Sequence, residues 1–243
     1  MNKPVLILET GAPLPSLRHH GGFGHWIRVA AGLRRGQFET VRVDAGEPLP
    51  DPASAAAVIL SGSAAMVSDR LPWSESCAAW LREAHARALP MLGICYGHQL
   101  LAHALGGVVG NHPQGREMGT VEIVLDGEAE GDALLAGQPA RFRVQMSHLQ
   151  TVLERPPGTR VLAHSRHDRH AVLHFGGRCW GVQFHPEFSA THMRGYVRGR
   201  APALRAEGLD PVGIEASVAP TPWARRLLRR FVRIALAGTE RPR

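Results

Sequence analysis

The first 107 residues alternate short apolar runs with segments of helical spacing, and this alternation restricts the fold more than any other feature of the sequence. Four runs have the apolar or alternating character of β-strands, at residues 4–9, 38–45, 55–61 and 90–94. Residues 24–35 and 73–89, which lie between them, carry apolar residues at helical spacing. Strands that alternate with helices through short connections usually form a parallel sheet. We therefore predict an α/β fold with an open, mostly parallel sheet and helices on both faces.

The pattern changes after residue 119, where short β-rich segments follow one another between glycine, proline and aspartate turns. These segments cover residues 119–125, 141–147, 159–165, 170–177 and 178–185. They predict antiparallel additions to the same sheet, or a small second sheet. A proline-containing stretch near 211–222 is expected to separate this body from a final helix at 223–238.

The predicted final helix is amphipathic and strongly basic. One side carries Trp223, Leu227, Leu228, Phe231 and Ile234, and arginines fill much of the remaining surface. A basic amphipathic helix can bind membranes or acidic partners. Because one apolar stripe is also what a helix needs to pack on its own domain, we favour packing on the body of the protein, with the arginines in water.

The composition predicts a cytoplasmic protein with reduced cysteines. No run approaches the ~18 apolar residues of a membrane helix, and the N-terminal residues lack the pattern of a signal peptide. Cys77, Cys95 and Cys179 are an odd number without CxxC spacing, which disfavours a disulfide framework and a thiolate zinc site.

The net charge of +7 and the 14 histidines raise two further questions, a nucleic-acid partner and a metal site. The cations are nearly all arginines spread through the chain, and no RNA-binding module or zinc-finger spacing accompanies them, so we expect no nucleic-acid partner. Four histidines lie close together in sequence, at His164, His167, His170 and His174. Their spacing matches no ligand pattern with a mechanism behind it, so we interpret them as loop residues and predict no metal.

A cysteine stands where the strand at 90–94 passes into a helical segment, in the sequence GICYG at 93–97. In the G-x-nucleophile-x-G arrangement, a sharp strand-to-helix turn lifts the central side chain out at the top of the sheet, and the flanking glycines relieve crowding. The helix N-terminus behind the thiol favours the thiolate. We interpret Cys95 as a nucleophile, and Cys77 and Cys179 as structural.

A cysteine nucleophile needs a base, and the base needs an orienting group. The segment GVQFHPE at 181–187 offers both, because alternate residues of an extended chain point the same way. Glu187 can then lie beside His185. The sequence predicts a triad of Cys95, His185 and Glu187 assembled from distant segments.

GICYGHQLLAHALGG and GVQFHPE closely resemble the two signatures of the class I (triad) glutamine amidotransferases. The chain is most similar to the stand-alone GMP-synthase-like amidotransferases, which are related to plant γ-glutamyl peptidases. The resemblance implies a flavodoxin-like amidotransferase domain at 1–190, with a C-terminal helical extension at 191–243 packed on the same domain. It also implies a thioester between Cys95 and the γ-carbonyl of glutamine, with His185 as base and then as acid. Ammonia leaves first and water then frees glutamate, which requires no metal or organic cofactor.

The tetrahedral intermediate needs donors for its oxyanion. One is expected to be the backbone N–H of Tyr96, and the second to come from the loop Ser61-Gly62-Ser63. The family usually has two adjacent glycines and a proline there, whereas this chain has Ser63 and Ala64 in place of Gly-Pro. Gly62 is the surviving match, which leaves the geometry of the second donor open.

The resemblance also implies four substrate contacts. Gln99 matches the family glutamine that borders the substrate, and Ser147 and His148 match the segment whose backbone receives the substrate's α-carboxylate and amine. Glu117 lies in a stretch that resembles part of the pocket wall, although an ordinary charged turn is an alternative. The family commonly has Asp two positions after the histidine, whereas this chain has Gln150, so recognition of the α-amino group could differ.

Three functions are compatible with these residues. We favour a glutaminase subunit that takes a small-molecule substrate and docks a synthetase. The sequence has no P-loop pattern, and we expect the residues after 190 to leave no room for an ATP-pyrophosphatase domain. The first alternative is a self-sufficient γ-glutamyl hydrolase without a partner. The second is a non-catalytic binding module, which predicts a broken triad. We expect no membrane partner, and whether the chain forms a homo-oligomer stays open.

Overall fold

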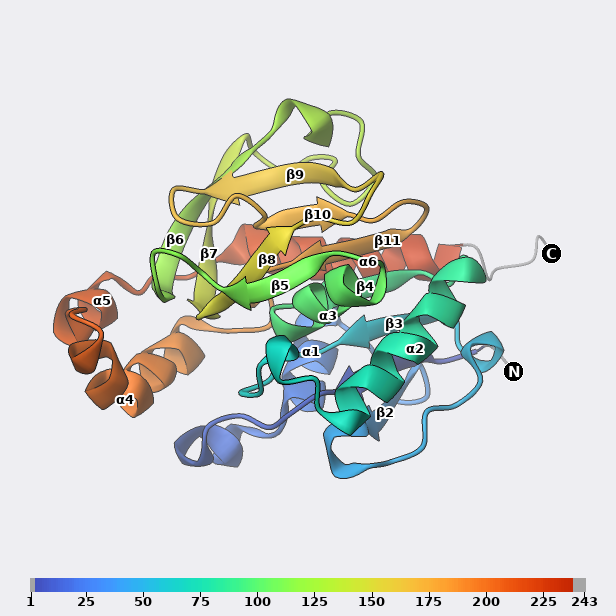
Figure 1. The fold of residues 1–243 in the computed structure, drawn as a ribbon, viewed down its shortest axis with the longest axis horizontal. Helices are drawn as coiled ribbons and strands as arrows, with labels where there is room; N and C mark the ends of the chain where they lie inside the picture. Colours follow the sequence, from blue (N-terminus) through green and yellow to red (C-terminus); the bar gives the residue numbers. More distant parts are fainter. Residues whose placement is uncertain (1–2, 238–243) are drawn as a thin grey trace.

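A nine-stranded mixed sheet runs through the centre of the molecule, with helices on both of its faces (Figure 1). The computed structural model describes residues 3–237. Five neighbouring strands are parallel, in the spatial order β2 (Phe38–Arg42), β1 (Val5–Glu9), β3 (Ala57–Leu60), β4 (Met91–Ile94) and β11 (Cys179–Val182). This is the α/β sheet that the alternation of strands and helices predicted.

Four antiparallel strands continue the same sheet beyond β11. In spatial order these are β10 (Val172–His174), β9 (Arg160–Ser165), β6 (Glu117–Leu125) and β7 (Arg141–His148). Two further strands, β5 (Val108–Asn111) and β8 (Gln150–Glu154), form a separate antiparallel pair. The predicted β-rich segments therefore follow the first of the two predicted arrangements, antiparallel additions to the same sheet. The β5–β8 pair was not predicted, because each strand is short and their pairing joins segments 39 or more residues apart.

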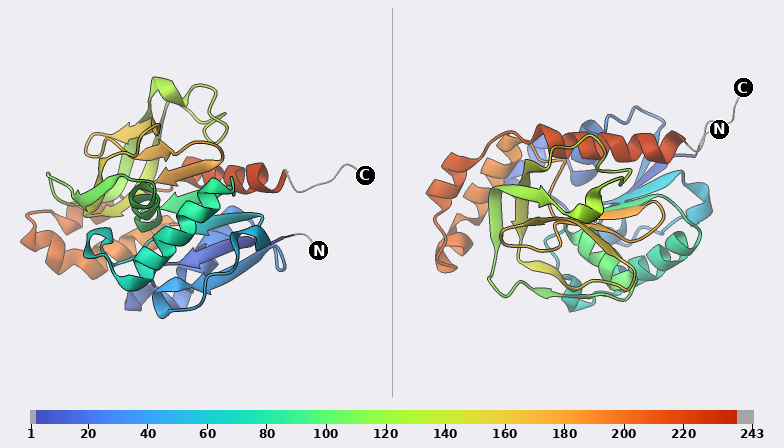
Figure 2. Two further views of the ribbon diagram at one scale, coloured as in Figure 1. Left: turned by 45° about the vertical axis from the view of Figure 1, so that its right-hand side comes forward. Right: turned by 90° about the horizontal axis from the view of Figure 1, so that it is seen from above.

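The two faces of the parallel strands bury alternate residues. Val5 and Ile7 of β1 pack with α1 (Phe23–Ala31) and α6 (Pro222–Ala237). Leu6 and Leu8 pack with α2 (Pro72–Ala86) and α3 (Tyr96–Ala104) on the opposite face. Figure 2 shows α6 along one side of the sheet and α2 along the other. Because successive side chains of a strand alternate between faces, one apolar run supplies both cores.

The α6 helix has the amphipathic pattern that the sequence predicted. Leu227, Leu228 and Phe231 are fully buried, and α6 contacts α1 and β7. Gly238, the last residue of the predicted helix, lies outside the described residues.

Two further helices lie beside the ends of β6 and β7, where Figure 1 shows them in orange. They are α4 (Ala190–Ala206) and α5 (Pro211–Ser217), and they share a third apolar cluster with the loop after β1. Residues 211–217, in the stretch expected to separate the body from the last helix, form α5 and lie within the predicted helical extension. Pro211 occupies the first turn of α5, where its missing N–H breaks no intrahelical hydrogen bond, and Asp210 accepts hydrogen bonds from Val212 and Gly213. The predicted division of the chain at residue 190 stays a prediction.

Short 3-10 turns complete the described chain. They are η1 (Pro15–His20), η2 (Val43–Ala45), η3 (Pro52–Ser54), η4 (Val67–Asp69) and η5 (Gly127–Ala129). Among residues 3–237, no helix combines the length and the apolar character needed to cross a bilayer.

Candidate active site

The register of three parallel strands brings the predicted site residues to one edge of the sheet. Leu60 of β3 is paired with Gly93 of β4, and Ile94 of β4 is paired with Val182 of β11. The loop after β3, Cys95 after β4 and His185 after β11 therefore leave the sheet at its carboxyl edge. Ligands of open α/β sheets bind at this edge.

Cys95 occupies a strained backbone position between β4 and α3. Its φ of 50° and ψ of −103° lie outside the usual regions for a side-chain-bearing residue. A Cβ atom at Gly93 would lie 2.4 Å from the carbonyl oxygen of Gly97, and one at Gly97 would lie 2.5 Å from Cβ of Leu60. The turn is therefore too tight for any residue but glycine on either side of the cysteine, as the motif predicted.

The three predicted triad residues meet at this turn. Cys95 and His185 both lie against Gly62: from the ideal Cβ position of Gly62, Cε1 of His185 is 2.8 Å away and Cβ of Cys95 is 3.7 Å away. Nδ1 of His185 lies 2.8 Å from Oε1 of Glu187, so the carboxylate accepts a hydrogen bond from the ring. Phe188 stacks on the imidazole, with ring centroids 4.1 Å apart. The three triad residues are only 4–6% exposed, which keeps water from competing for this bond.

The electrostatics favour a thiolate–imidazolium pair. Burial by itself raises the pKa of Cys95, but the charge of His185 and the hydrogen bond with it outweigh burial and lower the pKa below its ordinary value. Burial lowers the pKa of His185, while the carboxylate of Glu187 and the thiolate of Cys95 raise it to about 10. Both shifts favour a thiolate beside a protonated ring.

A buried threonine, which the sequence analysis missed, holds the loop after β3. Oγ1 of Thr10 donates to the carbonyl oxygens of Ser61 and Gly62, each at 3.1 Å. In a trans peptide the N–H points away from the carbonyl, so these bonds turn the N–H groups of Gly62 and Ser63 away from Thr10. Gly62 lies close to Cys95: a Cβ atom built at Gly62 would be 3.7 Å from Cβ of Cys95.

Tyr96 begins α3, directly after the nucleophile. The first N–H groups of a helix have no partner within the helix, so the backbone there can donate to an oxyanion. The phenol of Tyr96 lies 2.6 Å from Oγ of Ser74 and ties the start of α3 to α2.

A cavity of about 40 Å³ opens beside Cys95. Its lining includes six of the predicted residues: Ser63, Cys95, Tyr96, Gln99, Ser147 and His148. Nε2 of Gln99 donates to the carbonyl oxygen of Gln150 at 2.6 Å and to Oε1 of Gln183 at 2.9 Å, so its orientation is set by buried neighbours.

The side chains of His148 and Glu117 are hydrogen-bonded to each other. Nε2 of His148 lies 3.1 Å from Oε2 of Glu117, and Nδ1 lies 2.9 Å from the carbonyl oxygen of Gln150. The other oxygen of Glu117 accepts from Oγ of Ser165 at 2.8 Å. Burial lowers the pKa of His148, but the bond with Glu117 and the charge of Asp168 raise it above its ordinary value. Glu117 is absent from the cavity lining, and its link to the cavity is the bond with His148, so the structure does not place it as the predicted substrate contact.

Comparison with known proteins gives the family. A profile of the family described as "Glutamine amidotransferase class-I" matches residues 19–198. The chain belongs to this family. The match confirms the resemblance drawn from GICYG and GVQFHPE and the predicted enzyme class.

Curated relatives carry GMP synthase names. A "GMP synthase [glutamine-hydrolyzing]" of Aeropyrum pernix is 44% identical over 151 residues, which cover 60% of this chain and 26% of the relative. A relative from Ignicoccus hospitalis, named as one subunit of a glutamine-hydrolysing GMP synthase, is 44% identical over 109 residues, 44% of this chain and 56% of the relative. The chain thus spans about a quarter to about half of the length of these relatives.

Solved structures share the fold of this amidotransferase. A glutamine amidotransferase from Thermotoga maritima superposes with a TM-score of 0.76 at 21% identity, covering 96% of this chain and 98% of that one. A glutamine amido transferase from Methylobacillus Flagellatus gives a TM-score of 0.75 at 23% identity, covering 100% and 98%. These likenesses confirm the predicted fold class.

The remaining candidate residues of the amidotransferase have separate partners. The four clustered histidines bond individually to Asp126, Gly115, Val152 and Arg160. Within residues 3–237, no three His, Cys, Asp or Glu side chains gather as metal ligands would. Burial raises the pKa of Cys77 to about 12, and it also raises the pKa of Cys179. Both thiols therefore stay protonated at neutral pH.

Residues beyond the motifs also reach the site. Arg116 and Arg200 both line the cavity beside Cys95, and Arg200 belongs to α4. The sequence carried no signal for Arg200, because one arginine among many in the predicted helical extension has no distinguishing neighbours.

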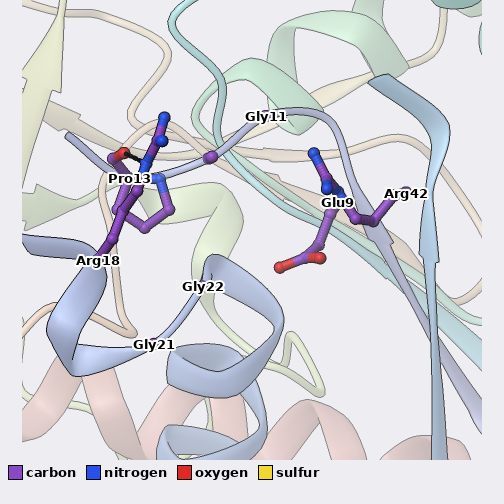
Figure 3. A pocket seen from close by; sticks show the side chains of 8 residues that line it. Glu9, Gly11, Pro13, Arg18, Gly21, Gly22 and Arg42 are labelled. Atoms are coloured by element: carbon purple, nitrogen blue, oxygen red, sulfur yellow. Dashed lines mark hydrogen bonds between the residues drawn. The ribbon is translucent and has the colours of Figure 1, made fainter. Parts of the chain in front are cut away.

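A larger cavity of about 330 Å³ lies next to the site, at the ends of β1 and β2 (Figure 3). Glu9, Arg18 and Arg42 contribute its charged side chains. None of the predicted site residues lines it. Oε1 of Glu9 accepts a hydrogen bond from the N–H of Gly24 at 2.5 Å, so this carboxylate caps the start of α1.

Proposed function

We propose that this chain hydrolyses the γ-amide of glutamine through a thioester on Cys95. The observation that carries the proposal is the placement of Cys95 and His185 against the same glycine, Gly62, with the imidazole bonded to Glu187 at 2.8 Å. A charged sulfur held at the mouth of a cavity attacks carbonyl carbons, and an amide is cleaved by such an attack.

The first step forms the bond between sulfur and the γ-carbon. The oxyanion receives hydrogen bonds from the N–H of Tyr96 and from the Gly62–Ser63 loop that Thr10 orients. The imidazolium of His185 gives its proton to the nitrogen as the carbon–nitrogen bond breaks, and ammonia leaves. Glu187 stabilises the proton on the ring before this transfer.

The second step returns the enzyme to its starting state. His185 accepts a proton from water, whose oxygen attacks the thioester carbon. The carbon–sulfur bond breaks, glutamate leaves and the sulfur is again a thiolate beside an imidazolium.

The γ-glutamyl part of the substrate occupies the cavity with Gln99 and the backbone of residues 147–149. His148 supports this backbone from behind, since both of its ring nitrogens are bonded to protein oxygens. The relatives' names further support an acceptor for the ammonia on a synthetase chain.

The test is hydrolysis by the purified chain. We expect glutamate and ammonia in equal amounts from glutamine, and a γ-glutamyl hydroxamate when hydroxylamine intercepts the thioester. Cys95→Ala is expected to form neither product. Equal activity in that variant would place the nucleophile elsewhere.

A further inference from the structure

Two contacts restrain the imidazole of His185 in its own plane. Nδ1 bonds to Oε1 of Glu187 at 2.8 Å, and Cε1 lies against Gly62. A ring held by one hydrogen bond can still rotate about the line of that bond. Because a proton is transferred well only along a properly aimed N–H bond, the base also needs a contact on a face of the ring.

Phe188 makes this face contact. Its ring stacks on the imidazole of His185, with the centroids 4.1 Å apart and the planes at 22°. Its backbone N–H donates to the carbonyl oxygen of His185 at 3.2 Å, which closes a turn over residues 185–188. An imidazole that rotated out of its plane would meet the phenyl ring. Phe188 therefore restrains the motion that the bond with Glu187 leaves open.

Phe188 lies outside the spaces where a substrate can bind. It lines neither the cavity of about 40 Å³ beside Cys95 nor a cavity of about 170 Å³ that has His185 in its lining. Only 4% of its surface is exposed. An effect of Phe188 on the reaction must therefore pass through the imidazole.

Aromatic residues from two helices surround Phe188. Its ring centroid lies 6.4 Å from that of Phe23 and 5.5 Å from that of Trp26, both in α1. The ring of Tyr196, in α4, lies 4.8 Å away. All four residues are only 3–5% exposed. Because such rings pack closely in preferred orientations, this cluster leaves the ring of Phe188 little freedom to move away from His185.

Phe188 also stands directly before the N-cap of α4. Oγ of Ser189 accepts a hydrogen bond from the N–H of His192 at 3.1 Å, and Nδ1 of His192 accepts one from the N–H of Ser189 at 3.4 Å. This is a capping box. Met193, the fourth residue of the helix, is buried in the same apolar cluster as Phe188. An apolar pair at these two positions fixes the direction in which a chain enters a helix.

The stacked ring favours the charged form of the base as well. The face of an aromatic ring carries partial negative charge and attracts a cation. In the proposed reaction, His185 is an imidazolium until it gives its proton to the leaving nitrogen. The contact with Phe188 therefore stabilises the form of His185 that acts in the first step.

We propose that Phe188 is a positioning residue that fixes the plane of the His185 imidazole, and that the start of α4 fixes Phe188. The helix that follows the triad then has a part in catalysis, although the triad precedes it in the chain. This inference rests on the proposed function, because it needs His185 to act in cleavage by Cys95.

The test compares Phe188→Leu, which removes the ring, with Phe188→Tyr, which keeps it. Phe142→Leu is the matched control. Phe142 is also 4% exposed, belongs to a different core cluster and lies at the end of β7 away from His148. Glutamate release from glutamine is measured as a function of pH, together with thermal unfolding of each variant. Cys95 and Glu187, the charged groups that raise the pKa of the imidazole, are present in all of them.

We expect Phe188→Leu to lower kcat by about tenfold or more and to leave KM within about twofold, since no substrate contact is lost. The high-pH limb of its rate profile should move down by about one pH unit, because the imidazolium loses its aromatic neighbour. Phe188→Tyr should keep kcat within about threefold of wild type, with the limb in place. Phe142→Leu should lower the melting temperature by a similar amount and keep kcat.

A smaller change tests the part played by α4. Ser189→Ala removes the cap and is expected to lower kcat by about threefold, and Ser189→Thr should restore it. Asp210→Ala, which removes the cap of α5, is the control and should keep kcat. This series decides the proposal if Phe188→Leu does not fold. Unchanged kcat in Ser189→Ala would show that the start of α4 does not hold Phe188.

Two results with Phe188→Leu would overturn the positioning role. One is an unchanged kcat with an unmoved pH limb. The other is an equal loss of kcat in Phe142→Leu at the same melting temperature, which would indicate general destabilisation. A wild-type chain that releases no glutamate from glutamine would instead refute the proposed function, and the positioning role with it.

Discussion

Gly62 lies directly against the imidazole of His185: a Cβ atom at position 62 would be 2.8 Å from Cε1 of the ring. The conformation of the loop after β3 and the position of the base are therefore linked. Ring and loop approach each other only because residue 62 has no side chain. The same loop is proposed to supply an oxyanion donor, so one glycine serves two parts of the site.

Gly62→Ala is expected to displace the imidazole and lower kcat for glutamine by about 100-fold, since small misplacements of a catalytic group have large effects. Glutamate release at saturating glutamine measures it. Gly127→Ala is the control, because a Cβ at Gly127 meets nothing within 4 Å. Unchanged kcat in Gly62→Ala would show that the ring is not held by this contact.

Cys95→Gly is expected to be more stable than Cys95→Ala, by about 1 kcal/mol in the free energy of unfolding. The φ of 50° and ψ of −103° are strained for alanine and accessible to glycine. The larger entropy of glycine in the unfolded chain offsets part of this stabilisation of Cys95→Gly. Urea denaturation of both inactive variants measures the difference. Equal stabilities would mean that the turn is unstrained.

The thiolate of Cys95 is expected to persist below the ordinary cysteine pKa of about 8.5. The charge of His185 lowers the pKa of Cys95, so the midpoint of the pH profile for alkylation by iodoacetamide should lie below that of an ordinary thiol. His185→Gln should shift the midpoint upward. Cys95→Ala controls for labelling of Cys77 and Cys179, and a wild-type midpoint at the ordinary cysteine value would contradict the ion pair.

The raised pKa of His185 predicts that the free energy of unfolding depends on pH. The pKa of His185 in the folded chain is raised to about 10, above its unfolded value of about 6.5. Its contribution to stability is therefore complete below about pH 6.5 and is lost as the pH rises through about 10. Thermal unfolding from about pH 6 to about pH 10.5 should show a loss in wild type that is smaller in His185→Gln.

Glu187→Gln is expected to lower kcat by about 10- to 100-fold, less than His185→Ala, because an orienting group contributes less than the base itself. Loss of the carboxylate removes a cause of the raised pKa of His185, so the high-pH limb of the rate profile should move to lower pH. Glu122→Gln, at an exposed carboxylate paired with Arg141, is the control. An unmoved limb would argue against the carboxylate–imidazole contact.

Thr10→Val is expected to lower kcat for glutamine by about tenfold with little change in KM, because the loop donors act on the oxyanion and not on the bound substrate. Valine keeps the shape of threonine but loses the hydroxyl that holds the carbonyls of Ser61 and Gly62. Thr10→Ser restores the hydroxyl and should recover most of the rate. A loss that serine does not restore would indicate packing, and not orientation of the loop.

The parts of the site that the sequence predicted depend on residues that lie close together in the chain. The turn at Cys95 is encoded by Gly93 and Gly97, which the close approaches of the backbone require. His185 and Glu187 are two residues apart and meet directly, at 2.8 Å. Such relationships depend on neighbouring residues, so they can be inferred from spacing alone.

The alternation of apolar runs and helical spacing, and the turn around Cys95, determined the α/β sheet and the edge where the triad lies, because strand and helix periods are properties of consecutive residues. Only the tertiary structure decided that Thr10 orients the loop after β3, that Glu117 bonds to His148, and that Arg200 enters the site from α4. Each of these is a contact between segments far apart in the chain. Their orientation follows from how the sheet and helices pack, which no local pattern of residues encodes.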